Sequence, residues 1–75
     1  MLTADELAAR LVRVRRLRGL RAAQLADAAG ISRQALSHLE HGERFGSIAT
    51  YMMIADALGM TVGELLGDTR GADKR

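Results

Sequence analysis

Cysteine, proline and tryptophan are absent from this 75-residue sequence, and tyrosine and phenylalanine occur once each. Without cysteine the chain can form neither a disulfide framework nor a thiolate metal site, and no thiol can act as a nucleophile. The two histidines alone are too few to hold zinc. With Phe45 and Tyr51 as the only aromatic residues, the core must be aliphatic and methionine-filled. The composition therefore predicts one small domain that holds no metal and no other cofactor.

Long apolar runs are also absent. A membrane-spanning helix needs roughly 20 apolar residues, and no run approaches that length. The first ten residues lack the basic start and apolar stretch of a signal peptide, so we expect a cytoplasmic protein. No paired carboxylates with a base, phosphate-binding glycine loop or serine nucleophile turn occurs either, and we expect no enzymatic activity.

Positive charge is present, and it is unevenly distributed. The chain has a net charge of +2, but residues 10–44 contain eight arginines and three carboxylates, a local charge of +5. Such a region suits a polyanion, because arginines that replace the counterions of phosphates release those ions. Two alternatives are a solvated arginine-rich helix and a basic helix on a membrane. The membrane reading is disfavoured because the apolar stripe of that helix is needed for the core.

Capping residues and glycines divide the chain into short helical segments. Thr3 and Thr61 are each followed three residues later by glutamate, the spacing of a capping box. Ser32 and Ser47 are further N-cap candidates, and Gly30 follows the last apolar residue of one segment, where helices commonly stop. The pattern predicts an all-α, compact five-helix bundle with helices at residues 4–18, 22–29, 33–41, 47–58 and 62–66.

Residues 1–67 are expected to form the domain, followed by a polar, flexible tail at residues 68–75. In the fourth helix the apolar spacing predicts a set of inward-facing side chains. These are Ile48, Tyr51, Met52, Ala55 and Leu58.

The segment 22–40 predicts two short helices that meet at a tight turn. Gly30 ends the first and Ser32 caps the second, so one helix stops and the next starts within three residues. Leu25 and Leu36 lie where two steeply crossing helices would each turn an apolar side chain toward the other, and Ala26 permits close approach. This is the plan of a helix-turn-helix DNA reader. A generic antiparallel helical hairpin would share these signals.

Several separated blocks, in order, resemble the phage-repressor and Cro type of helix-turn-helix domain, also called xenobiotic-response-element-like, over residues 7–66. The blocks are Arg15, Gly19-Leu20, Leu25-Ala26, Gly30-Ile31-Ser32, Leu36-Ser37, Leu39-Glu40 with Gly42, and the run 54–66. The resemblance implies a lambda-repressor-like fold, double-stranded DNA as a partner and usually a homodimer. It also implies that Arg15 and Glu40 form an internal ion pair.

Two places depart from the family pattern. Arg21-Ala22 stand where Ser or Thr followed by Gln is usual, which weakens one expected phosphate contact. Phe45-Gly46 stand where Asn-Pro usually precedes the serine of the fourth helix, which implies a more flexible loop with an apolar side chain that can be exposed.

The helix at residues 33–41 is the predicted reading helix, because a bare helix fits the major groove. Its outward residues are the expected base contacts, and the resemblance implies the same for most of them: Arg33, Gln34, Ser37 and His38. Phosphate contacts are expected from the rim around this helix: Arg21, Ser32, Arg44 and Ser47. Each of these side chains could instead be a solvated surface residue.

A small core and a single reading helix both favour dimerisation on a palindromic operator, with the two helices about 34 Å apart. The expected interface consists of apolar residues left over after the core is filled: Phe45, Met53, Met60, Val62 and Leu65. Scattered exposed apolar residues, which are common, are the alternative.

We therefore expect a sequence-specific double-stranded DNA-binding transcriptional regulator, in the usual case a repressor, encoded by a bacterium or a phage and associated with the nucleoid when bound. An antitoxin-like or other partner-binding module, with DNA binding secondary, is the second hypothesis. A stoichiometric protein partner that co-purifies would favour it.

Overall fold

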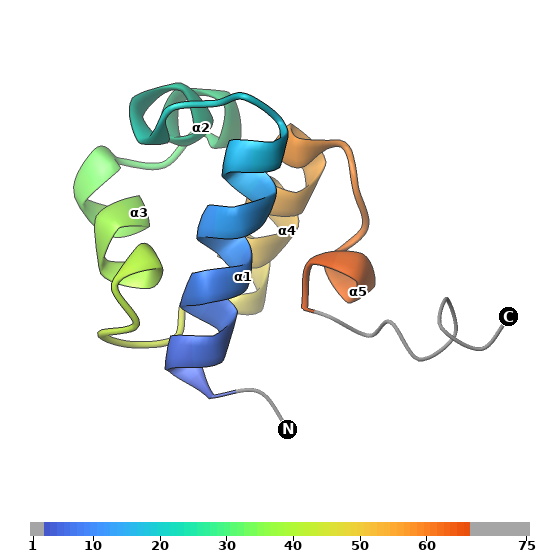
Figure 1. The fold of residues 1–75 in the computed structure, drawn as a ribbon. Helices are drawn as coiled ribbons and strands as arrows, with labels where there is room; N and C mark the ends of the chain where they lie inside the picture. The colour runs from blue at the N-terminus through green and yellow to red at the C-terminus, as the bar shows by residue number, and fades with distance from the viewer. Residues whose placement is uncertain (1–2, 67–75) are drawn as a thin grey trace, which may run out of the picture.

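The computed structural model describes residues 3–66, which form five α-helices and no strand (Figure 1). They are α1 (Ala4–Leu17), α2 (Ala22–Ala29), α3 (Arg33–Glu40), α4 (Ile48–Leu58) and α5 (Val62–Leu65). The expected all-α bundle is confirmed, and the helix ends differ from the predicted ones by about a residue. Within the described range no helix combines the length and apolar character that crossing a membrane requires. The expected tail at 68–75 lies outside the described residues.

Side-chain caps decide where the helices begin. At the start of α1, Thr3 Oγ1 accepts the Glu6 N–H at 3.0 Å and Glu6 Oε1 accepts the Thr3 N–H at 2.8 Å. Thr61 and Glu64 form the same reciprocal pair at α5, at 3.1 and 2.9 Å. Ser32 Oγ accepts a backbone N–H of α3 at 3.0 Å. Each cap satisfies a donor that has no partner inside its helix.

The turn between α2 and α3 occupies three residues. Gly30 has φ +74°, in the left-handed region where a Cβ is disfavoured. The N–H groups of Gly30 and Ile31 bond back to carbonyls of α2 at 3.2 and 3.0 Å. The chain then becomes extended at Ser32 (φ −74°, ψ 155°) and enters α3. This tight turn sets the steep angle between the two helices (Figure 1).

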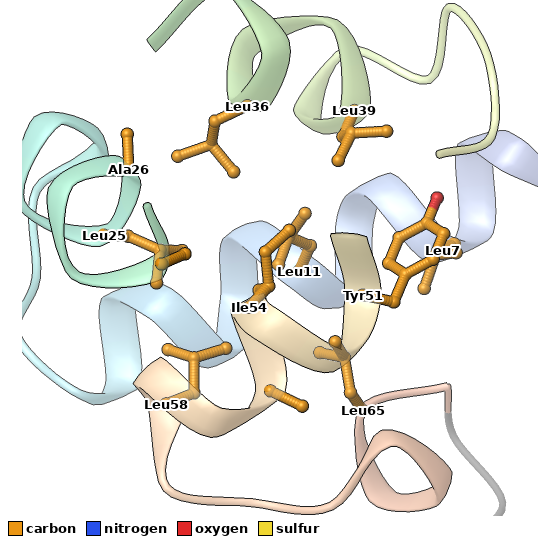
Figure 2. Close-up of a cluster of buried hydrophobic side chains, with 12 residues drawn as sticks. Leu7, Leu11, Leu25, Ala26, Leu36, Leu39, Tyr51, Ile54, Leu58 and Leu65 are labelled. Atoms are coloured by element: carbon orange, nitrogen blue, oxygen red, sulfur yellow. The ribbon is translucent and has the colours of Figure 1, made fainter. Parts of the chain in front are cut away.

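Each of the five helices contributes one large, fully buried aliphatic side chain to a single core. These are Leu11, Leu25, Leu36, Ile54 and Leu65. Burying such a side chain stabilises the fold by about 1.5–3 kcal/mol. Figure 2 shows the leucines of α3 pointing toward α2 and toward Leu11 and Ile54 at the centre.

The inner face of α4 differs from the prediction. Tyr51, Ala55 and Leu58 face inward as expected, but Ile48 and Met52 are 61% and 55% exposed. The prediction for Ile48 and Met52 was wrong, and Ile54 takes the inner position instead (Figure 2). Apolar residues occur almost all round this helix, so the spacing does not distinguish the face that the other helices cover.

Candidate nucleic-acid interface

Helix α3 is buried on one side only. Leu36 and Leu39 point into the core with 0% and 6% exposure (Figure 2). The four residues expected to read bases lie on the remaining surface: Arg33, Gln34 and Ser37 are exposed, and His38 is half-buried. The structure therefore gathers these four side chains along one outward ridge of a single eight-residue helix.

The end of α3 is attached to α1 by an ion pair between Arg15 and Glu40. Arg15 Nε donates to Glu40 Oε2 at 2.7 Å, and Arg15 Nη2 donates to Glu40 Oε1 at 3.2 Å. Arg15 Nη1 also donates to the Leu20 carbonyl at 2.9 Å. The side chains are only 12% and 10% exposed. The pair that the family resemblance implies is thus present, and because it is largely shielded from solvent it fixes the end of α3 against α1.

A second attachment lies two residues beyond Glu40, at Gly42 in the turn that follows α3. This residue has φ +71°, and a Cβ built on it would lie 3.2 Å from Asp5 Cα and overlap the Asp5 carboxylate. The start of α1 therefore packs directly against the end of the α3 segment. We did not expect this contact, because nothing near Asp5 in the sequence indicates which distant segment covers it.

Of the expected phosphate-binding residues, Ser32 and Arg44 lie beside α3, whereas Arg21 and Ser47 lie at the starts of α2 and α4. Ser32 caps α3, and its hydroxyl keeps a proton to donate. Ser47 caps α4 by accepting the Thr50 N–H at 3.1 Å and shares a 3.0 Å hydrogen bond with the Thr50 hydroxyl. Arg21 and Arg44 are exposed. These residues thus offer hydroxyl and guanidinium donors at the starts of α2, α3 and α4 and in the α3–α4 loop.

The start of α2 shows how the chain compensates for its departure from the family pattern. Arg21 occupies the N-cap position with an extended backbone, and its guanidinium has no acceptor for the helix N–H groups. Gln24 provides half of a capping box instead, because its Oε1 accepts the Arg21 N–H at 2.8 Å. The Arg21 guanidinium remains exposed at the surface.

Two of the candidate reading residues have intramolecular neighbours that the sequence did not indicate. His38 Nε2 lies 3.7 Å from Glu43 Oε1, in an ion pair only if the imidazole is protonated. His41 Nδ1 lies 2.7 Å from the Ser37 carbonyl and 3.3 Å from the Ser37 hydroxyl. Glu43 and His41 therefore belong to the description of the ridge, because each competes for a group that would contact DNA.

A groove of about 300 Å³ separates α3 from the α3–α4 loop. Its lining includes Gln34 and His38 of the ridge and also Ser32 and Arg44 of the rim. Phe45, which is 55% exposed, lines it from the loop side. The structure thus brings Phe45 next to α3.

The five residues expected at a dimer interface do not behave alike. Met53 is 42% exposed, and Met60 and Val62 are half-buried against the core. The prediction for Leu65 was wrong, because its side chain is fully buried between α5 and the rest of the core. In Figure 1 the loop that contains Phe45 lies on the α3 side of α1, whereas α5 lies on the other side.

Among residues 3–66, no group of three or more His, Asp or Glu side chains is arranged to hold a metal ion. The arrangement instead offers hydrogen-bond donors, acceptors and guanidinium groups on a protruding helix. Such a surface can bind a polar, negatively charged partner, and the described part of the chain shows no cluster arranged for metal-assisted chemistry.

Comparison with known proteins agrees with this geometry. Residues 6–66 match the sequence model of a protein family described as the helix-turn-helix domain. Two crystal structures of the clp gene regulator ClgR from Corynebacterium glutamicum are similar to it, with 30% sequence identity and TM-scores of 0.82 and 0.80. Each alignment covers 96% of this chain, and they cover 77% and 94% of the ClgR chains.

An HTH_3 family transcriptional regulator from Vibrio cholerae is 29% identical, with a TM-score of 0.80 over 87% of this chain. The alignment spans only 36% of the Vibrio chain, so the present chain corresponds to about a third of that protein. No curated protein is significantly similar in sequence. The match over residues 6–66 shows that the chain belongs to the helix-turn-helix domain family, a non-enzymatic family of DNA-binding transcriptional regulators.

Proposed function

We propose that this protein is a sequence-specific double-stranded DNA-binding transcriptional regulator that inserts α3 into the major groove. The observation that carries the proposal is the outward ridge of α3, held to α1 by the Arg15–Glu40 pair and the Asp5–Gly42 contact. The B-DNA major groove is about 12 Å wide and admits a bare helix. The transcriptional regulators from Vibrio and Corynebacterium that share this fold support the same function.

Base reading follows from the side chains on the ridge. Arg33 can donate two hydrogen bonds to guanine O6 and N7, and Gln34 can pair in the same bidentate way with adenine. Ser37 and His38 can donate to base edges or to nearby phosphates. Their neighbours, Glu43 among them, must rearrange or be displaced on binding.

Phosphate contacts come from the rim. Arg21 and Arg44 supply charge, while Ser32 and Ser47 supply hydroxyls beside the N-termini of α3 and α4. These contacts hold register without reading sequence. They also make binding depend on salt, because each phosphate that is neutralised releases counterions.

The regulator binds a palindromic operator as a homodimer and acts as a repressor by occupying DNA that polymerase needs, in the cytoplasm of a bacterium. Met53 of α4, Met60 of the α4–α5 connection and Val62 of α5 remain as the dimer surface, without the buried Leu65 and without Phe45, which lies in the α3–α4 loop beside α3. Two-fold symmetry would place the reading helices about 34 Å apart, which matches one turn of DNA. Sedimentation of the wild type and of Met53→Asp, free and on operator DNA, tests this arrangement.

The test of the function is selection of bound duplexes from a random library, followed by direct binding with Arg33→Ala. We expect a two-fold symmetric motif and, for the variant, relaxed preference at one base pair per half-site. A library that shows no enrichment would contradict the proposal. A motif that Arg33→Ala leaves unchanged would remove Arg33 from the reading set.

A second function is favoured by one observation. Leu17, Ile48 and Met52 are more than half exposed and lie outside the ridge and the groove. Such side chains suit a partner-binding module of the antitoxin type. A stoichiometric partner whose binding is abolished by Met52→Asp, with the fold intact, would support this function.

A further inference from the structure

We propose that Phe45 and Ala35 form an apolar contact for the 5-methyl group of a thymine at one edge of the operator half-site. Phe45 was expected at a dimer interface, and the inference assigns it to DNA reading instead. It rests on the proposed function of α3 and names a base that this function would recognise.

The first step is the place of Ala35 on the helix. Successive residues of a helix are rotated by about 100°, so Ala35 follows Gln34 and His38 around α3 on the side toward Leu39. Ala35 is exposed, whereas Leu39 is buried. The methyl group of Ala35 therefore stands between the polar ridge and the core, and it lines the groove.

The second step is that the loop holds Phe45 in position. The Gly46 N–H donates to Tyr51 Oη at 3.0 Å, so the buried tyrosine anchors the backbone next to Phe45. Gly46 is also packed tightly on α3, because a Cβ there would lie 3.1 Å from Leu39 Cδ2. The flexible loop implied by the missing Asn-Pro is thus replaced by a loop fixed against α3, and the exposed ring lies in the groove.

The third step identifies the occupant by its chemistry. The groove is continuous with the ridge through Gln34 and His38, carries Arg44 at its edge and has no carboxylate among its lining residues. Arg44 favours a negatively charged occupant, and Gln34 and His38 can hydrogen-bond to base edges. The apolar side chains of the groove add a place for one apolar group. In the major groove the thymine C5-methyl is the apolar group that a phenylalanine or alanine side chain contacts.

The experiment uses the intact protein and the operator recovered by selection. Each thymine of one half-site is replaced in turn by deoxyuridine, which removes the methyl group and keeps every hydrogen-bonding atom. For the wild type we expect one thymine at which the replacement weakens binding by about threefold to fivefold, the scale of one buried methyl group. For Phe45→Ala, which leaves only the small Ala35 methyl at this place, we expect the same replacement to weaken binding by less than about twofold.

Matched variants separate this contact from general effects. Met52→Ala removes a side chain that is as exposed as Phe45 but lies on α4 outside the groove, and it should retain the wild-type response to deoxyuridine. Phe45→Leu keeps an apolar side chain and should retain part of the response. Thermal unfolding of the three variants checks that the fold is unchanged.

The outcomes are distinct. If deoxyuridine weakens wild type and Phe45→Ala equally at every thymine, the inference is overturned while the proposed function stands. If Phe45→Ala alters only self-association, a second copy occupies the groove, and the inference is likewise overturned. If the protein selects no DNA sequence, the inference and the proposed function are both overturned.

Discussion

Arg15 of α1 and Glu40, the last residue of α3, are joined by two partly buried hydrogen bonds of 2.7 and 3.2 Å. The pair connects the last turn of α1 to the helix that would read DNA. Because Arg15 also binds the Leu20 carbonyl, the same guanidinium fixes the turn between α1 and α2. The orientation of the ridge on α3 therefore depends on a residue that makes no contact on the ridge.

The first prediction concerns this pair. Glu40→Ala leaves the Arg15 guanidinium buried without its carboxylate, and we expect a loss of about 3–5 kcal/mol in the free energy of unfolding. Urea denaturation measures it. Glu43→Ala, at an exposed carboxylate three residues further on, is the control and should change stability by no more than about 0.5 kcal/mol. Equal small losses in both variants would contradict a structural role for Glu40.

The second prediction compares two glycines with nearly the same φ. Gly30→Ala adds a Cβ at φ +74° with no atom within 4 Å, so we expect only the conformational cost of about 1–2 kcal/mol. Gly42→Ala has φ +71° but meets Asp5, and it should be clearly more destabilising. Thermal melts of the two variants give the comparison. If Gly42→Ala is the milder of the two, Asp5 does not pack there.

The third prediction separates reading from phosphate binding. Arg33→Ala should cost about 1–3 kcal/mol on the selected operator and lose preference at one base pair. Arg44→Ala should weaken specific and nonspecific duplexes alike and reduce the slope of log affinity against log salt by about 0.9. Titrations of both duplexes at several salt concentrations distinguish the two patterns. The assignment of roles is refuted when both variants show the same pattern.

The fourth prediction concerns the acidic neighbour of His38. Glu43→Gln removes a carboxylate 3.7 Å from His38 Nε2, on the edge of a surface proposed to meet phosphates. Exposed pairs of this kind are worth about 0–1 kcal/mol, so we expect operator affinity to rise by up to about fivefold and the gain to shrink with added salt. The control is Asp56→Asn, an exposed carboxylate on α4. Weaker binding by Glu43→Gln would show that Glu43 assists the complex.

Much of the fold could be predicted from the sequence, because helix starts and stops depend on neighbours within one turn. The Thr3–Glu6 and Thr61–Glu64 spacings predicted reciprocal caps that the structure contains. Gly30 and Ser32 likewise predicted the turn between α2 and α3. The ridge on α3 was predictable for the same reason, since buried Leu36 and Leu39 define the opposite face.

Other features depend on which segments of the chain pack against each other. For these features the sequence led to a wrong prediction or to none. Ile48, Met52 and Leu65 carry apolar side chains like their neighbours, yet only Leu65 of these three is buried. The Asp5–Gly42 and His38–Glu43 contacts have no local signature either.

The amino-acid order alone determined the helices, their caps and the polar edge of α3, because hydrogen bonds and side-chain spacing within a helix are short-range. Only the packed structure decided which face of α4 is covered, that Leu65 is inside, and that Phe45 lies beside α3. Burial is a property of contacts between distant segments. A helix that is apolar on all sides therefore contains no information about the neighbour it will acquire.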